Sequence, residues 1–217
     1  MTTDVAATTA ARRPVVAHVL HGVVALCAGV GVGVEISRAV GADGSVLANL
    51  VHLFSYFTIW TNTLVCAVSA VLAVRPRADG PVFRALRLDS VQFVVVTGVT
   101  YHLLLSGYTA PDAAGRFANL VTHTIVPVAL VVVWLLVGPR RRVRPVTMAT
   151  ALVLPALWTV WTFVRGHVTG WYPYPFLDAS ELGFARALVG SLTILALGAA
   201  LGPVAWLLDR VLPPAPR

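Results

Sequence analysis

Two side chains in apolar surroundings are of types that could do chemistry together. His123 lies in the apolar run Ala118–Trp134, four residues before Pro127, and Thr58 lies in a segment that begins at His52 and reads HLFSYFTIWTNTLV. In a helix Pro127 would leave the His123 carbonyl without its usual N–H partner, so we expect a kink at the turn that carries the imidazole. A hydroxyl needs a neighbouring base to act as a nucleophile, and neutral imidazole is such a base near pH 7.

The surroundings of these side chains are typical of a membrane protein. Of 217 residues, 58% are hydrophobic and 12% are charged, whereas about a quarter of the residues of a soluble domain are charged. An apolar run of about 20 residues is long enough to cross the hydrocarbon core of a bilayer. The sequence contains six such runs, at Pro14–Ile36, Val51–Val74, Leu88–Ser106, Phe117–Val137, Val146–Val164 and Arg186–Leu208. The predicted fold is therefore all-α, with six transmembrane helices in a polytopic membrane protein.

The basic residues predict the orientation of these helices. With both termini in the cytoplasm, twelve of the sixteen basic residues fall in cytoplasmic segments, in agreement with the positive-inside rule. We expect a cytoplasmic tail at residues 1–13, disordered over 1–11, a single membrane domain at 14–210 and a cytoplasmic proline-rich tail at 211–217. The net charge of +7 then reflects orientation in the membrane and indicates no nucleic-acid partner. All basic residues are arginine, which hints at a GC-rich bacterial genome and hence at a plasma-membrane location.

The predicted spans place Thr58 and His123 at similar depths below the outer surface. At about 1.5 Å per residue, Thr58 is roughly 10 Å and His123 roughly 9 Å from the outer ends of their spans. Asn62 shares the helix face of Thr58 one turn later, and His102 lies one turn from the outer end of the third span. The alternative interpretation is structural, because Ser, Thr and Asn side chains in membranes commonly bond their own i−4 carbonyls or hold helices together.

Two kinds of chemistry fit histidines and a hydroxyl gathered near the outer surface. The first is nucleophilic catalysis by the hydroxyl, with an imidazole as base. The second is metal or haem binding by histidines of separate helices, with Asp112, Asp178 or Glu35 as further metal ligands. No HxxxH, HExxH or CxxC spacing, phosphate-binding loop or dinucleotide-binding glycine pattern occurs, so the motifs predict no cofactor and no metal site. The aromatic outer loop 165–183 is either an interfacial belt or a lid.

Three stretches of the chain resemble a known family of membrane proteins. They are HVTGWYPYPFLD at His167–Asp178, YFTIWTNTLV at Tyr56–Val65 and NLVTHTIVP at Asn119–Pro127. Together they resemble the androgen-induced-gene and FAR-17a family of integral membrane proteins, and more specifically its actinobacterial branch. Animal members of this family are threonine hydrolases that cleave fatty acid esters of hydroxy fatty acids.

The resemblance implies roles for particular residues. Thr58 matches the family nucleophile and His123 the family histidine, so the expected partners are membrane lipids or lipid esters. Supporting or substrate-binding roles are expected for Asn62, His102, His167, Trp171 and Asp178. Asp178 or Asp112 could orient the histidine, and Asn62 or His102 could stabilise an oxyanion. The competing class is a non-enzymatic protein that binds or moves a lipid, because fold does not fix function. The sequence leaves the oligomeric state open.

Overall fold

The computed structural model describes residues 2–108, 112–138 and 140–213, and its regular structure there is helical. Six helices in these ranges are long and apolar enough to cross a membrane, at Val15–Gly41, Phe57–Val74, Pro81–Leu105, Ala113–Val137, Pro145–Thr169 and Phe184–Val211. Large apolar side chains cover the outside of the bundle. Leu103 and Val168, for example, are 75% and 77% exposed, which suits a hydrocarbon surrounding and not water. The prediction of an all-α fold with six membrane-spanning helices is confirmed.

The six spans are built from ten longer and shorter helical pieces. The first two spans are α1 (Thr2–Gly41) and α3 (Phe57–Val74), and the third is α4 (Pro81–Thr100) continued by the π-helical turn η1 (Tyr101–Leu105). The fourth consists of α5 (Ala113–Leu120), the π-helical turn η3 (Val121–Ile125) and α6 (Val126–Val137). The fifth consists of α7 (Pro145–Ala151) and α8 (Val153–Thr169), and the sixth is α10 (Phe184–Val211). The connections contain α2 (Val46–Leu53), η2 (Ser106–Tyr108), η4 (Pro175–Leu177) and α9 (Ala179–Leu182).

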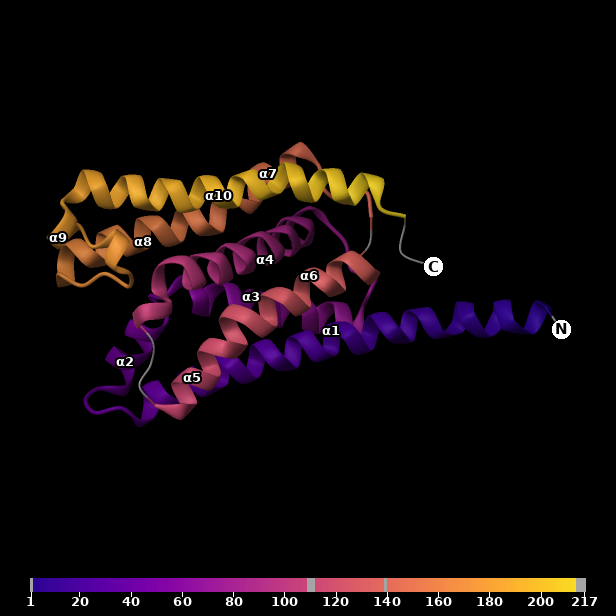
Figure 1. Cartoon of the computed structure of the whole chain (residues 1–217), viewed down its shortest axis with the longest axis horizontal. Helices are drawn as coiled ribbons and strands as arrows, with labels where there is room; N and C mark the ends of the chain where they lie inside the picture. Colours follow the sequence, from indigo (N-terminus) through magenta and orange to yellow (C-terminus); the bar gives the residue numbers. More distant parts are fainter. Residues whose placement is uncertain (1, 109–111, 139, 214–217) are drawn as a thin grey trace.

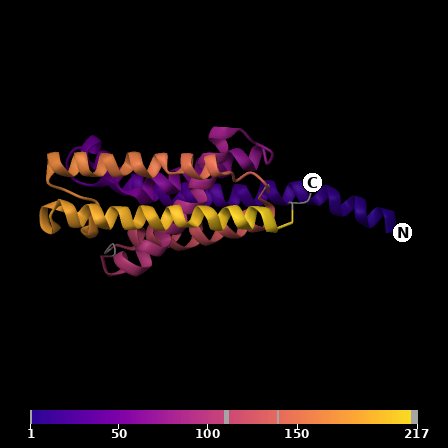
Figure 2. The same ribbon diagram turned by 90° about the horizontal axis from the view of Figure 1, so that it is seen from above.

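Helix α4 lies at the centre of the bundle. It packs against α3, α6, α7 and α10, and 61% of its most apolar stretch is buried, against 22% for α10. Helices α8 and α10 lie side by side on one flank of α4, and α1, α3 and α6 lie on the other (Figures 1 and 2). Helix α1 begins and α10 ends at the same end of the bundle, whereas α2 and α9 lie at the opposite end (Figure 1). Which end faces the cytoplasm stays a prediction.

Several predicted span boundaries are wrong, and two of these errors affect the depth of a candidate residue. The second span begins at Phe57 and not at Val51, because α2 is a separate helix and Tyr56 has an extended backbone before α3. The fourth span begins at Ala113 and not at Phe117, because the Asp112 side chain caps α5 by accepting the Gly115 N–H at 2.6 Å. Thr58 is therefore in the first turn of its span, whereas His123 lies deeper along its own.

The chain ends and the outer loop also differ from the prediction. Helix α1 begins at Thr2, so it includes residues that the sequence predicted to lie in a terminal tail. Of the predicted proline-rich tail, residues 214–217 lie outside the described residues. Helix α8 extends to Thr169, so the outer connection is shorter than the predicted loop 165–183 and begins at Gly170, which has a φ of 70°.

The turn that carries His123 departs from regular α-helix, as Pro127 predicted. Residues 121–125 form a π-helical turn in which the Val126 N–H donates to the Val121 carbonyl. Such wide turns accommodate a missing backbone donor. Gly98 of α4 packs directly on this turn, because a Cβ built at Gly98 would lie 2.9 Å from the His123 carbonyl oxygen and 3.3 Å from Pro127 Cγ. The absence of a side chain at Gly98 therefore lets α4 approach the backbone of the histidine turn.

We expect Gly98→Ala to destabilise the bundle and displace the His123 turn. The added methyl meets backbone, which cannot rotate away, and overpacking of this kind costs about 1–3 kcal/mol. Thermal unfolding in detergent measures the loss. Gly33→Ala is the matched control, because no atom lies within 4 Å of a Cβ built there. Equal midpoints for Gly98→Ala and wild type would show that the two helices are less closely fitted than the structure indicates.

Candidate active site

Thr58 and His123 lie in contact inside the bundle. Thr58 Oγ1 is 3.1 Å from His123 Nε2, and the two residues are each 8% exposed. Thr61, Thr97 and Thr122 bond backbone carbonyls of their own helices, as threonines in helices commonly do. Thr58 instead directs its hydroxyl across the bundle from α3 to η3. A hydroxyl held against a ring nitrogen is the arrangement that nucleophile activation requires.

The hydrogen bonds of His123 Nδ1 determine the tautomer of the imidazole, and therefore that Nε2 is the hydrogen-bond acceptor. His123 Nδ1 lies 3.1 Å from the Asn119 carbonyl oxygen and 3.1 Å from Thr122 Oγ1. A carbonyl oxygen can only accept, so Nδ1 carries the proton and donates it. Nε2 is then free of a proton and accepts from the Thr58 hydroxyl. Tyr101 stacks on the imidazole, with ring centroids 4.0 Å apart and planes inclined by 21°, and so restricts its rotation.

Tyr174 is the third polar group at Thr58, and it comes from the outer loop. Its hydroxyl lies 3.4 Å from Thr58 Oγ1 and accepts from the Thr58 N–H at 3.4 Å. The Phe57 N–H also faces this hydroxyl. Because Thr58 donates to His123, Tyr174 is the donor to Thr58 Oγ1. Burial of the phenol raises the pKa of Tyr174 to about 12, so the hydroxyl remains a neutral donor at physiological pH.

Asn62 connects the two helices that carry the pair. Its Nδ2 donates to the Thr58 carbonyl at 3.0 Å and to the Thr122 carbonyl at 3.2 Å, and the side chain is fully buried. The amide nitrogen thus joins the first turn of α3 to the residue that precedes His123. Both amide hydrogens are engaged, so Asn62 positions the site and is not available as the oxyanion donor considered from the sequence.

A polar cavity of about 520 Å³ opens beside the pair. It is lined by α1, α2, α3, α5, η1, η3 and the outer loop, with residues that include Glu35, Arg38, Asn49, His52, Tyr101, Thr58 and His123. Arg38 donates to Glu35 at 2.7 Å and to Asp112 at 2.6 Å. Burial and the nearby Arg165 guanidinium lower the pKa of His52, so its imidazole is neutral near pH 7. A cavity of this size has room for both water and a substrate.

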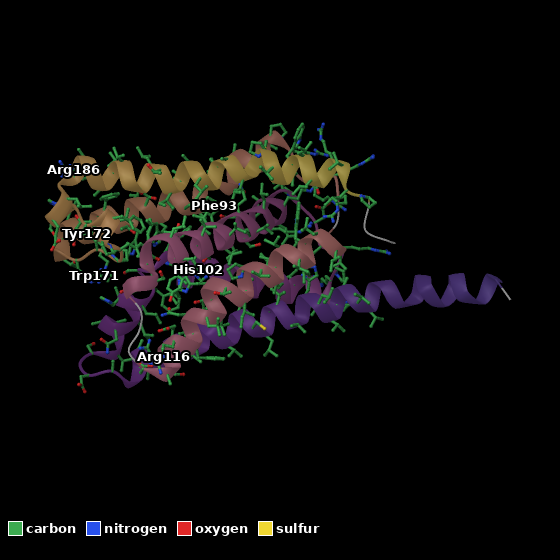
Figure 3. All side chains as sticks on the ribbon, viewed as in Figure 1. Phe93, His102, Arg116, Trp171, Tyr172 and Arg186 are labelled. Carbon is green, nitrogen blue, oxygen red and sulfur yellow. The ribbon has the colours of Figure 1, made fainter. Side chains whose placement is uncertain are left out.

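Most of the other predicted site residues lie away from Thr58. His102 is exposed, and its Nε2 is 3.0 Å from Thr124 Oγ1. His167 is exposed on α8. Asp178 caps α9 by accepting from the N–H groups of Ser180 and Glu181, so it does not orient His123. Trp171 packs on His52, with centroids 3.9 Å apart, and lies at the end of the bundle that carries Arg186 (Figure 3).

The arrangement thus differs from the sequence prediction in its supporting residues. A backbone carbonyl, that of Asn119, takes the orienting role considered for Asp178 or Asp112. Tyr174 occupies the position beside Thr58 that was considered from the sequence for Asn62 or His102 as oxyanion donor. No spacing rule could have predicted this tyrosine, because it lies in a loop more than a hundred residues after the start of α3. Within the described ranges, no group of three or more histidine, cysteine, aspartate or glutamate side chains is close enough to hold a metal ion.

The fold and the buried pair define a multi-pass helical membrane protein with a hydroxyl–imidazole site. The model of the FAR-17a/AIG1-like protein family matches residues 101–203, so this part of the chain is similar to that family. The matched stretch contains His123 and the outer loop with Tyr174, whereas Thr58 and Asn62 precede it. No curated protein matches the chain, and no solved structure does.

We expect Asn62→Leu to weaken the bundle and separate the pair. The substitution keeps the approximate volume of the side chain but removes the two hydrogen bonds that the amide donates to the carbonyls of Thr58 and Thr122. Each such hydrogen bond contributes about 0.5–1.5 kcal/mol. Chemical or thermal unfolding in detergent measures this loss. Thr63→Val serves as the control, since Thr63 lies one residue later and is exposed. An Asn62→Leu protein as stable as the control would show that the amide bridge contributes nothing.

Proposed function

We propose that the protein is a membrane-embedded hydrolase of lipid carboxylic esters, with Thr58 as nucleophile and His123 as general base. The observation that carries the proposal is the oriented hydrogen-bond chain from Thr58 Oγ1 to His123 Nε2 and from His123 Nδ1 to the Asn119 carbonyl. A threonine with a purely structural role commonly bonds a backbone carbonyl of its own helix, whereas Thr58 bonds the unprotonated nitrogen of an imidazole whose tautomer is fixed by the Asn119 carbonyl. The region that matches the FAR-17a/AIG1-like family model, residues 101–203, includes His123.

The proposed reaction has two steps. Thr58 Oγ1 attacks the ester carbonyl carbon while its proton passes to His123 Nε2, and the protonated imidazole then gives that proton to the departing alkoxide as the ester C–O bond breaks. Water from the polar cavity next attacks the acyl-threonine, again with His123 as base. The bond from Thr58 to the acyl carbon breaks, Thr58 recovers a proton from the imidazole, and a carboxylic acid leaves.

Tyr174 supplies electrostatic stabilisation in this proposal. In the resting state its hydroxyl donates to Thr58 Oγ1. When Oγ1 bonds to the ester carbonyl carbon, the negative charge moves to the carbonyl oxygen on that same carbon. The Tyr174 hydroxyl and the Thr58 N–H, both adjacent to Oγ1, are then the donors for this oxyanion. The phenol suits this role because it remains protonated.

The proposed setting is the plasma membrane, with lipid esters reaching Thr58 through the polar cavity. That cavity lies at the end of the bundle opposite the start of α1, which the arginine distribution predicts to be the outer end. Glu35, Arg38, Asn49 and His52 give the cavity wall its polar groups. A substrate with a polar or charged portion beyond the ester fits such a wall better than a purely apolar lipid does.

Labelling with a fluorophosphonate tests the nucleophile. We expect the purified wild-type protein to be labelled, Thr58→Ala to lose the label completely, and His123→Ala to label at least about 10²-fold more slowly, since general-base catalysis contributes that much. Gel fluorescence at several times gives the rates. His102→Ala is the matched control, because this histidine is exposed and bonds Thr124, and it should label at the wild-type rate. Equal labelling of wild type, Thr58→Ala and His123→Ala would make the pair structural.

Tyr174→Phe tests the oxyanion donor. Loss of one such donor lowers kcat by about 10²-fold in comparable sites, and KM should change much less because the ring remains. A raised pKa means that the hydroxyl is protonated at every pH below about 12, so wild-type activity should not decline between neutrality and pH 10 through this group. Tyr172→Phe is the control, since the Tyr172 ring lies against Gly166 and Phe163. A kcat for Tyr174→Phe equal to that of Tyr172→Phe would contradict the role.

A further inference from the structure

A second, apolar cavity lies on the other side of Tyr174. It measures about 40 Å³ and is lined mainly by aromatic and aliphatic side chains of α3, α4, α8, η4 and α10, among them Phe57, Phe93, Val96, Trp158, Phe176 and Leu177. Its polar lining residues include Thr97, Thr100, Thr159 and Ser191. Phe93, which lies about midway along the bundle in Figure 3, is 1% exposed. This cavity is distinct from the polar one and extends into the flank formed by α8 and α10.

The two cavities meet at the proposed nucleophile. Thr58 and Tyr174 line both of them, and Leu105 does so as well. The ring of Tyr174 has neighbours on both sides. It stacks on Phe176 with centroids 5.4 Å apart, and its edge meets Tyr56 at 5.8 Å. Phe176 belongs to the lining of the apolar cavity and Tyr56 to that of the polar one. Tyr174 is therefore the partition between the two compartments.

The position of His123 decides which compartment receives which part of an ester. A carbonyl carbon bonded to Thr58 Oγ1 carries two further substituents, the acyl chain and the leaving oxygen. The general acid must reach the leaving oxygen, and His123 lines the polar cavity only. The leaving group and the attacking water therefore belong on the polar side. The acyl chain then has the apolar cavity as its place, where burial of its methylenes is favourable.

We propose that the apolar cavity behind Tyr174 binds the acyl chain of the ester, and that Phe176 and Tyr174 limit the length of that chain. The inference rests on the proposed ester hydrolysis and adds the substrate class, esters of short-chain acids. A cavity of about 40 Å³ has room for only a few water-sized groups. A long chain requires its walls to move, and Phe176 is the wall residue that stacks directly on the partition without taking part in the chemistry.

Hydrolysis of a series of p-nitrophenyl esters tests the length limit. For wild type we expect kcat/KM to be higher for the butyrate than for the octanoate ester. Phe176→Ala should raise the octanoate-to-butyrate ratio at least about tenfold, because each methylene accommodated in an apolar pocket is worth about that factor. Ile194→Trp, which adds volume to a half-buried wall position on α10, should lower the ratio. Phe163→Ala is the matched control, since Phe163 packs on Tyr172 and Phe184, and it should leave the ratio unchanged.

A binding measurement without turnover separates this proposal from the proposed function. Trp158 lines the apolar cavity, so a butyrate with a terminal bromine should quench its fluorescence in Thr58→Ala, and the quenching should disappear in Thr58→Ala/Trp158→Phe. Quenching together with no esterase activity in wild type would support the acyl site and overturn the hydrolase. Activity together with unchanged ratios in both wall variants and no Trp158-dependent quenching would overturn the acyl site alone.

Discussion

The π-helical turn at residues 121–125 is the feature on which the site depends. Pro127 cannot donate to the His123 carbonyl, so the helix widens there and does not continue as regular α-helix. The wide turn directs His123 across the bundle towards α3 while leaving the Asn119 carbonyl within 3.1 Å of Nδ1. Gly98 on one side allows close contact with the backbone of the turn, and Asn62 joins it to α3 on the other. A proline therefore sets the direction of the imidazole.

A polar pair inside a membrane bundle must also be satisfied locally. Water is scarce there, and each unpaired polar group costs free energy. The hydroxyls of Thr58 and Tyr174, the two nitrogens of His123 and the Asn119 carbonyl form one continuous series of hydrogen bonds in which each group has a partner. The series ends at the polar cavity on one side and at apolar side chains on the other. Such a boundary suits a substrate that is itself polar at one end and apolar at the other.

The sequence predicted the spans and the central residues because both depend on local signals. Apolar runs identify membrane helices, and the proline four residues after His123 predicts an irregular turn. The beginning of α3 was predicted wrongly, since Val51, Leu53 and Phe54 continue the apolar run towards the N-terminus, whereas the extended backbone at Tyr56 that separates α2 from α3 has no signature in the sequence. Tyr174 and Asn119 were missed for a different reason. A loop tyrosine between two prolines resembles an interfacial aromatic, and a backbone carbonyl as the partner of an imidazole has no sequence signature.

The most direct measurement is the capture of the acyl intermediate. The protein is incubated with a short activated ester, quenched in acid within the steady state and digested, and the peptides are examined by mass spectrometry. The mechanism derived from the Thr58–His123 geometry predicts an added acyl mass on the peptide that contains Thr58, localised to that residue by fragmentation. An acyl group found on a different residue, or continued hydrolysis by a Thr58→Ala protein, would contradict the assignment of Thr58 as nucleophile.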